Sequence, residues 1–321
     1  MAANLKRSKE IYDYYLIHGS QATQKKFNVV HEYIRRCGRV VRNSESPQDD
    51  IVSKNDLLKK ISQLYSDAEL KAIASGNKII SEIVPPAKLD FSGTSVKFCF
   101  FTDSHIGSIY FHQNLFESML EECKKESVEF YCHAGDVTDG MSNRPDHIYS
   151  LTHIGYDSQK QYAIQLLSDI DKPLYLISGN HDMYFVKSNG ANIVKDICSN
   201  ISNALFLGND LGRLEIKNTK IDLWHGEDGS SYATSYRLQK IVESLTGGSK
   251  PNTLLCGHTH KQGYFFERHI HTVSGGALSL QSDWMRSKRL ANHSGFWIIK
   301  MTLDQKGQVS CFSPSWYPFY Q

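Results

Sequence analysis

The chain has 321 residues, of which 40% are hydrophobic and 22% are charged, and its net charge is +2. This length and composition indicate a globular protein with a sizeable core, organised as one large and one small domain. No run of about 18 apolar residues occurs, so we expect no membrane span. The first nine residues are polar and basic, so we expect no signal peptide.

Seven cysteines, at positions 37, 99, 123, 132, 198, 256 and 311, form no CxxC pair. An odd number without a framework spacing predicts reduced thiols in a reducing compartment, and we expect a cytoplasmic protein. Cys99, Cys132 and Cys256 lie in apolar runs and are expected to pack in the core.

The first 45 residues form the first predicted domain and are basic. They hold nine Lys and Arg against four Asp and Glu, a net charge of +5 that leaves −3 for the rest of the chain. Apolar residues at helical spacing predict a helix that ends at Gly19, a short helix over 21–27, a turn at Asn28 and a third helix over 31–42. Four arginines project from this third helix and are the candidate DNA-binding residues: Arg35, Arg36, Arg39 and Arg42.

The segment Gly19-Ser20-Gln21-Ala22-Thr23, followed by Phe27-Asn28-Val29, resembles helix-turn-helix domains of the sigma-factor-region or recombinase type. This resemblance implies that the third helix enters the major groove of DNA. Arginines on that helix would neutralise backbone phosphates and gain affinity by releasing counterions. The alternative is a solvated basic face on a helical module for protein association or self-association.

Residues 46–93 are predicted as a linker and a helical connector, with a helix over 54–75. Over 94–321, strand-like apolar runs alternate with helical segments, which indicates a layered α/β domain. The predicted strands are 96–102, 128–134, 174–178, 221–224, 253–256, 271–274 and 296–301, and the predicted helices are 112–126, 156–170 and about 191–200. The aromatic tail, 312–320, is expected to pack on the surface of this domain.

Five short motifs each follow an apolar run. They are Asp103-Ser104-His105, Gly135-Asp136, Gly179-Asn180-His181-Asp182, His225-Gly226 and Gly257-His258-Thr259-His260. Ligands gather outside the carboxyl ends of strands in open α/β sheets, so we expect these motifs to converge in space. His nitrogens and Asp and Asn oxygens suit hard or borderline divalent ions. The set is large enough for two ions; we expect Mn²⁺, with Fe or Zn²⁺ as alternatives.

Charge supports this interpretation. Two divalent ions carry +4 while Asp103 and Asp136 carry −2, and the other candidate ligands are neutral. The remaining +2 favours a phosphate anion and lowers the pKa of a bridging water, which as hydroxide is the expected nucleophile. Asp136 has two carboxylate oxygens and can bridge both ions.

The order and wording of the five motifs resemble the calcineurin-like metallophosphoesterase superfamily over roughly residues 95–275. The resemblance implies a four-layer α/β/β/α sandwich. It also implies one ion held by Asp103, His105, Asp136 and His260, and a second held by Asp136, Asn180, His225 and His258. His181 would contact the phosphate and help the leaving group depart, and Asp182 would orient His181 through its second nitrogen.

Two of the motifs depart from the pattern of the Ser/Thr phosphatase and diadenosine tetraphosphatase branches. Those branches typically show GDxxDRG and GNHE, whereas this chain has Gly135-Asp136-Val137-Thr138-Asp139-Gly140 and GNHD. The motifs DSHIG and GNHD are more similar to the phosphodiesterase and DNA-repair nuclease branches.

We therefore predict a metal-dependent phosphodiesterase, most simply a DNA nuclease that the N-terminal segment brings to DNA. The alternative is a phosphodiesterase or phosphatase for a small molecule such as a nucleotide, with a regulatory or assembly role for the N-terminal domain. Outside the motifs, Arg144 is either a contact to substrate phosphate or a solvated loop residue, and His147 is expected on the surface.

Overall fold

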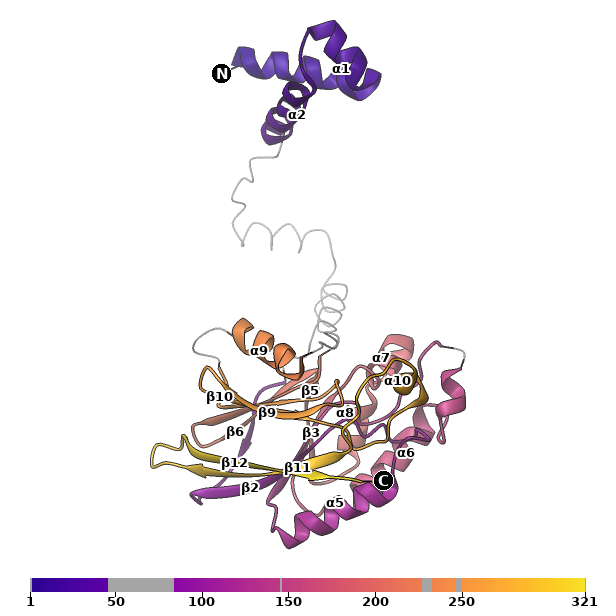
Figure 1. Cartoon of the computed structure of the whole chain (residues 1–321), viewed down its shortest axis with the longest axis vertical. Helices are drawn as coiled ribbons and strands as arrows, with labels where there is room; N and C mark the ends of the chain where they lie inside the picture. The colour runs from indigo at the N-terminus through magenta and orange to yellow at the C-terminus, as the bar shows by residue number, and fades with distance from the viewer. Residues whose placement is uncertain (1, 46–83, 145, 227–232, 246–249, 321) are drawn as a thin grey trace, which may run out of the picture. The chain divides into compact units, whose positions relative to one another are not determined.

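The structure is a computed structural model that describes residues 2–45, 84–144, 146–226, 233–245 and 250–320 (Figure 1). The chain divides into two compact units, residues 1–80 and 81–321. The helix expected over 54–75 lies outside the described residues.

The first unit contains α1 (Ala2–Phe27) and α2 (His31–Glu45). Gly19 interrupts α1 with a left-handed backbone (φ 76°, ψ 176°), and Asn28 (φ 51°) makes the turn into α2. Three helical segments therefore occur with the predicted breaks, because glycine and asparagine tolerate positive φ better than other residues. The first segment begins at Ala2, earlier than residue 11, where the apolar pattern starts.

A small core holds the first unit together. Ile11, Ile34 and Cys37 are almost fully buried there, with aromatic side chains packed around them. The predicted apolar stripes are only partly covered, since Leu16 is 64% exposed and Val30 is 67% exposed. Three short helical segments have too little surface to shield every apolar residue.

Among the described residues, the strands of the second unit form two six-stranded mixed sheets. The first has the order β12-β11-β2-β3-β4-β5, built from β12 (Val309–Pro318), β11 (Gly295–Leu303), β2 (Ser95–Phe101), β3 (Phe130–Ala134), β4 (Leu174–Ser178) and β5 (Ala204–Asn209). The second has the order β1-β6-β7-β8-β10-β9, built from β1 (Ala87–Leu89), β6 (Leu211–Ile216), β7 (Thr219–Trp224), β8 (Thr253–Cys256), β10 (Ile270–Gly275) and β9 (Gln262–Glu267). Strands β2 to β5 run parallel, as do β7, β8 and β10.

Helices cover the outer face of each sheet. The first sheet is covered by α5 (Gln113–Lys125), α6 (Tyr156–Leu167), α7 (Met183–Asn189) and α8 (Ile193–Ser199), and the second by α9 (Thr234–Ser244) (Figure 1). The short helices η2 (His147–Ser150) and α10 (Asp283–Ser287) lie in loops. The four-layer α/β/β/α sandwich is thus confirmed.

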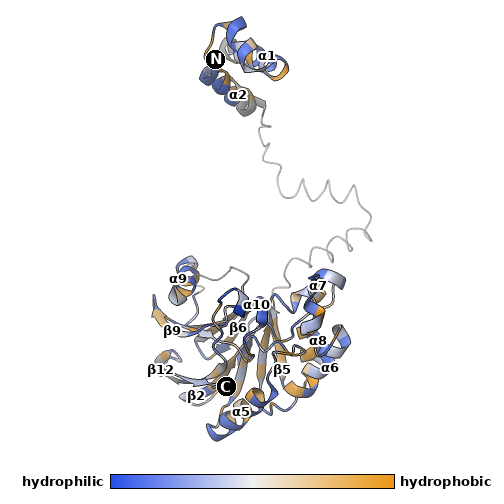
Figure 2. Ribbon diagram, turned by 45° about the vertical axis from the view of Figure 1, so that its right-hand side comes forward, coloured by the Kyte–Doolittle hydropathy of each residue, from blue (hydrophilic) through white to orange (hydrophobic). Residues whose placement is uncertain are grey.

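Alternating side chains of β2 show how the layers are held. Phe98 and Phe100 point into the core between the two sheets, whereas Cys99 and Phe101 point into the core under the helices. This alternation follows from the two-residue period of a strand. Figure 2 shows hydrophobic residues concentrated in the central strands and the helices beside them.

Among the described residues, five strands lie where sequence patterns predicted none, namely β1, β5, β6, β9 and β12. β1 falls in the stretch expected as connector and pairs with β6, so the sheet domain reaches back at least to Ala87. Most of the aromatic tail, expected only to pack on the surface of the domain, lies in β12, which pairs with β11 along nine residue pairs at the edge of the first sheet. An edge strand tolerates its prolines, Pro314 and Pro318, because one side needs no hydrogen-bond donors.

None of the helices in the described part of the chain combines the length and the apolar character that a membrane span needs.

Candidate metal centre

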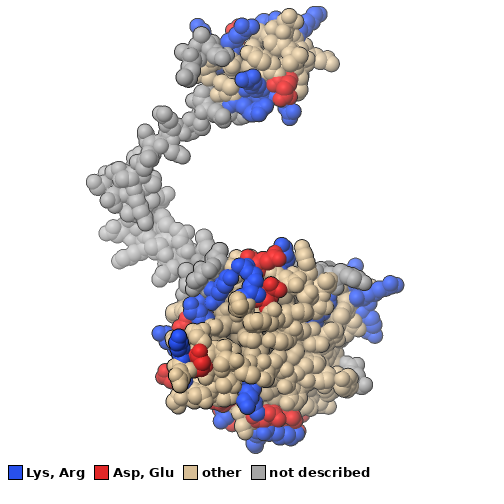
Figure 3. Space-filling view, turned by 60° about the vertical axis from the view of Figure 1, so that its left-hand side comes forward, with Lys and Arg blue, Asp and Glu red and all other residues tan. Residues whose placement is uncertain are grey.

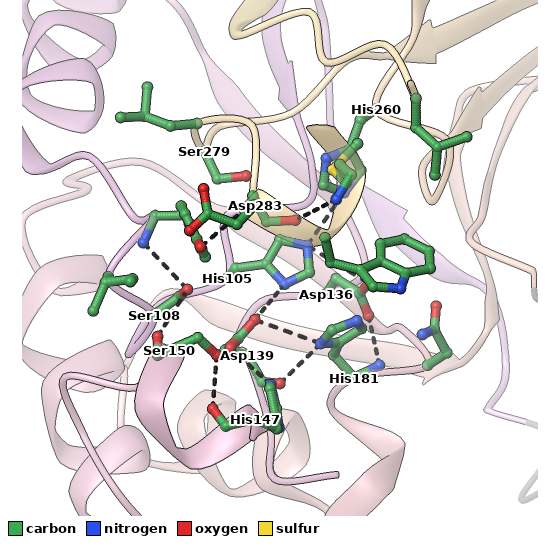
Figure 4. Close-up of a pocket in the computed structure, with 18 of the residues that line it drawn as sticks. His105, Ser108, Asp136, Asp139, His147, Ser150, His181, His260, Ser279 and Asp283 are labelled. Carbon is green, nitrogen blue, oxygen red and sulfur yellow. Dashed lines mark hydrogen bonds and ion pairs between the residues drawn. The ribbon is translucent and has the colours of Figure 1, made fainter. Parts of the chain in front are cut away.

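Loops at the carboxyl ends of β2, β3, β4, β7 and β8 bring the five predicted motifs together. They meet beside a cavity of about 700 Å³ whose lining includes Asn180 and His258. His105, Asp136 and His260 also line this cavity and are labelled in Figure 4. Asp103 and His225 are fully buried behind that lining. Residues spread over more than 150 positions of the chain therefore converge on one site, as the strand-end argument predicts.

The first group of candidate ligands surrounds His260. Its Nε2 lies 3.2 Å from Nε2 of His105 and 3.3 Å from Oδ1 of Asp103. Nε2 of His105 is also 3.9 Å from Oδ2 of Asp136. Ligand atoms that share an ion at about 2.0–2.2 Å lie roughly 3–3.5 Å apart, so these spacings suit a common ion.

The second group surrounds Asn180. Its Oδ1 lies 3.0 Å from Nε2 of His225 and 2.9 Å from Nδ1 of His258. Nε2 of His225 is also 3.3 Å from Oδ2 of Asp136. Asp136 thus stands in both groups, the position that a bridging carboxylate requires.

Hydrogen bonds on the far side of two rings fix which nitrogen carries the lone pair. Nδ1 of His105 donates to Oδ1 of Asp139 at 2.9 Å, and Nδ1 of His225 donates to the carbonyl oxygen of Ala134 at 2.7 Å. When these rings are neutral, their Nε2 atoms hold lone pairs that face other acceptors. Lone pairs that face one another with no hydrogen-bond donor between them repel, and a cation placed among them removes that repulsion.

His260 is oriented in the same way. Its Nδ1 donates to Oδ1 of Asn292 at 2.7 Å, while the amide nitrogen of Asn292 donates to the carbonyl of Ser279. Burial alone would raise the pKa values of Asp103 and Asp136, but the adjacent histidines lower both below the usual range. Both side chains are therefore carboxylates, and the donor set suits divalent ions.

The backbone of the site is strained. Five candidate ligands adopt a left-handed φ between 48° and 80°, namely Asp103, His105, Asp136, His258 and His260. Such conformations cost free energy in residues other than glycine and cluster at functional sites. Gly135 also has positive φ (91°), and a Cβ there would lie 2.6 Å from Nδ1 of His225. Only glycine therefore allows the chain to pass this close to the histidine.

His181 lines the cavity next to both groups, but its partner differs from the one expected. Nδ1 of His181 donates to the backbone carbonyl oxygen of Asp139 at 2.9 Å and lies 3.5 Å from the Asp139 carboxylate. The prediction that Asp182 orients His181 through this nitrogen is thus corrected. Although burial lowers the pKa of His181, the charges of Asp136 and Asp139 outweigh it and raise that pKa well above its usual value.

Asp182 instead ties two of the loops together. Its carboxylate accepts hydrogen bonds from the backbone N–H groups of Val137, Thr138 and Gly179 at 2.8–3.1 Å, and from the hydroxyl of Thr138. The side chain is buried, and burial together with Asp136 raises its pKa to about 6. Asp182 thereby fixes the loop that carries Asp136 against the loop that carries Asn180.

Asp182→Asn is expected to destabilise the fold. The NH₂ group of the new side chain would face backbone N–H groups, so two hydrogen-bond donors would meet without an acceptor between them. Losing hydrogen bonds to a buried charge typically costs about 1.5–3 kcal/mol. Thermal unfolding should show a clearly lowered melting temperature. Asp157→Asn changes an aspartate on the surface of α6 and is the matched control. Equal melting temperatures for the two variants would rule out this role for Asp182.

Two supporting residues were missed by sequence reasoning. His147, expected on the surface, donates from Nε2 to the Asp139 carboxylate at 3.1 Å and lines the cavity. Arg237, on α9, is buried and donates to the backbone carbonyls of His225 and Gly257. Both depend on loops and helices that fold back on the site, and no local sequence signal marks them.

The four predicted DNA-binding arginines lie in the first unit, on α2. Arg35, Arg36 and Arg39 are exposed, and the guanidinium of Arg39 is 3.5 Å from the carboxylate of Glu32. The side chain of Arg42 lies outside the described residues. On the face shown in Figure 3, Lys and Arg side chains stand out on this unit, with fewer acidic side chains among them.

Comparison with known proteins decides the family. Residues 96–262, more than half of the chain, match the family model for calcineurin-like phosphoesterases. The chain belongs to the calcineurin-like phosphoesterase family. The predicted resemblance is thereby confirmed, and membership in this phosphoesterase family implies a centre for divalent metal ions at the convergent His and Asp side chains.

Two curated relatives are archaeal proteins. The DNA polymerase II small subunit of Methanocaldococcus jannaschii is 24% identical over 65% of this chain and 43% of the relative. That of Archaeoglobus fulgidus is 23% identical over 75% of this chain and 56% of the relative. The chain spans about half the length of these relatives. Among solved structures, an archaeal phosphodiesterase is 15% identical with a TM-score of 0.42, covering 69% of this chain and all of that one.

Proposed function

We propose that this phosphoesterase is a dinuclear metal-dependent phosphodiesterase that hydrolyses DNA. The observation that carries the proposal is the convergence of seven acceptor side chains in two groups that share Asp136: Asp103, His105, Asp136, Asn180, His225, His258 and His260. Two ions in this place would polarise the phosphoryl group and supply a nucleophile of lowered pKa.

The chain's own residues have separate tasks in this proposal. Asp136 and the histidines would hold the cations, and the hydrogen bonds to Asp139 and Ala134 orient the imidazole rings of His105 and His225 for that role. His181 keeps a proton on Nδ1 through Asp139, so its Nε2 can carry the proton that the leaving oxygen needs. Asp182 holds the two loops on which this geometry depends.

DNA is favoured as substrate by two independent features. The curated relatives are named as subunits of a DNA polymerase. The first unit carries exposed arginines on one helix, which suit backbone phosphates. We propose that residues 1–45 are a helix-turn-helix-like DNA-binding domain, that residues 46–93 connect it, and that the rest is the catalytic domain.

A panel of substrates tests the proposal. Single-stranded DNA, duplex DNA, RNA, cyclic nucleotides and phosphomonoesters would each be incubated with Mn²⁺, Fe²⁺ or Zn²⁺. We expect DNA hydrolysis that is lost in His181→Ala. If the protein hydrolyses bis-p-nitrophenyl phosphate but leaves every DNA substrate intact, DNA is not the substrate. The proposal that the protein is a phosphodiesterase would still stand.

The second candidate is a phosphodiesterase for small nucleotides. A cavity of about 700 Å³ is large enough for a nucleotide and is the observation that favours it. In that case the same panel would show cyclic or mononucleotide turnover, and the first unit would serve assembly or regulation.

Salt dependence tests the DNA-binding role of α2. The double substitution Arg35→Ala/Arg39→Ala removes two exposed cations and should reduce the slope of log K against log salt by about 2. Duplex binding would be followed by fluorescence anisotropy between low and moderate salt. Lys6→Ala/Arg7→Ala removes the same charge from α1 and is the control. If both variants lose the same amount of slope, the DNA-binding role of α2 is contradicted, and α2 is only part of a diffuse basic surface.

A further inference from the structure

Away from the candidate ligands, the lining of the cavity includes aromatic and basic side chains together with the carboxylates of Asp146 and Asp283. Trp284, on α10, lines the cavity and is 53% exposed. Tyr149, on η2, lines it as well and is 84% exposed. Large aromatic side chains are mostly buried, and exposed ones in a cavity indicate a ligand surface.

The segment that carries Trp284 is tied to the candidate ligands themselves. The hydroxyl of Ser279 donates to the backbone carbonyl of Asp103 at 2.9 Å, and Asn292 accepts from His260 at 2.7 Å. Within the segment, Ser282 caps α10 and Met285 is buried. The segment that carries the indole is therefore anchored to the candidate metal ligands, although the indole ring itself is left open to solvent.

A guanidinium group lies over the same indole. The Cζ atom of Arg144 is 5.7 Å from the centroid of the Trp284 ring, and Arg144 also lines the cavity. A cation at this distance is attracted by the ring and can also reach a phosphate. The rim of the cavity therefore offers a flat aromatic face and a cation within a few ångströms of each other.

Basic side chains follow Trp284 in sequence, next to the cavity lining but not part of it. Arg286, Lys288 and Arg289 follow Trp284 and are exposed, and the carboxylate in this stretch, Asp283, pairs with Arg286. Aromatic side chains interleaved with cations are the pattern with which proteins bind single-stranded nucleic acid, since each base offers a face to stack and each phosphate a charge.

We propose that Trp284 stacks against an unpaired nucleobase of a single-stranded nucleic acid whose phosphodiester bond lies at the metal centre. Arg286, Lys288 and Arg289 would follow the backbone of that strand. A base inside a duplex already has both faces stacked, so the site selects a single strand or an opened end. This inference rests on the proposed function and names the form in which the substrate enters.

Binding is tested first, because it does not require activity. The chain has four tryptophans, and a base that stacks on Trp284 should quench its fluorescence. We expect an unlabelled single-stranded oligonucleotide to quench the wild-type protein, and that quenching component to be missing in Trp284→Phe. No quenching, or quenching that is the same in both proteins, would overturn the proposal.

The second test measures catalysis. We compare kcat/KM for a single-stranded oligonucleotide with kcat/KM for an abasic oligonucleotide of equal length and take the ratio of the two values. Trp284→Ala should lower this ratio by roughly 5- to 150-fold, the range for base stacking on an aromatic ring, and Trp284→Phe should restore most of it. Tyr236→Ala alters an equally exposed aromatic (54%) outside the cavity lining and should leave the ratio as it is.

The outcomes separate the two proposals. If the wild type hydrolyses DNA and Trp284→Ala keeps the wild-type ratio, the stacking site is wrong and the nuclease proposal stands. If no DNA is hydrolysed, the nuclease proposal fails, and the fluorescence experiment still decides whether Trp284 binds a base.

Discussion

Asp136→Ala is expected to lose both metal ions together and with them the hydrolytic activity. Its Oδ2 lies 3.3 Å from Nε2 of His225 and 3.9 Å from Nε2 of His105, so one carboxylate serves both groups of candidate ligands. Residues that merely support a ligand typically cost about 10–100-fold in metal affinity when mutated, and the loss of a shared ligand should exceed that. Isothermal titration with Mn²⁺ would measure the affinity and the number of ions.

Two controls accompany the measurement on Asp136→Ala. Asp146→Ala removes the same charge from the rim of the same cavity and should bind two ions like the wild type. Thermal unfolding shows whether Asp136→Ala is still folded, since Oδ1 of Asp136 also accepts the backbone N–H of His181. A folded Asp136→Ala protein that still binds two ions with wild-type affinity would contradict the bridging role.

His181→Ala is expected to keep its metal ions and to lose rate by about 10²–10⁴-fold, the usual effect of a missing general acid. Asp139, which is not among the candidate metal ligands, raises the pKa of His181 through its hydrogen bond and its charge, so the ring can carry the proton that the leaving group needs. The loss should be large for a substrate with an alkoxide leaving group and small for one that releases p-nitrophenolate, which needs no proton.

The pH dependence adds a separate readout. A general acid works only in its protonated form, so the wild-type rate should fall as pH rises through the pKa of His181, and His181→Ala should lose that alkaline limb. His153→Ala removes a histidine that stacks on Tyr162 outside the cavity lining and is the control. Equal rate losses for both kinds of leaving group would assign His181 to phosphate binding instead of proton transfer.

The predicted strands that proved right are the buried ones. Phe98, Phe130 and Leu174 belong to apolar runs that lie in parallel strands covered on both faces, and such runs stand out in a sequence. Strand β12 was missed because it is an edge strand with serine and proline among its aromatics, and β6 was missed because Gly212 and Arg213 interrupt its apolar residues. Edge strands and half-exposed strands have weak sequence patterns, and they form because they pair with a neighbouring strand.

The candidate ligands could be predicted because each follows a strand directly, so local position fixes where it lies. The supporting residues could not. Asp182 is adjacent to His181 in sequence, yet its side chain turns the other way, to the backbone of Val137 and Thr138. His147 reaches Asp139 only because its loop returns to the site, where Ser108 bridges Leu151. Tertiary contacts of this kind leave no trace in residue spacing.

The most direct measurement of the central claim is anomalous X-ray scattering from crystals soaked with Mn²⁺. We predict two peaks that share Asp136, one among Asp103, His105 and His260 and the other among Asn180, His225 and His258. No peak at these side chains, or a single peak that does not touch Asp136, would contradict the account of a dinuclear centre.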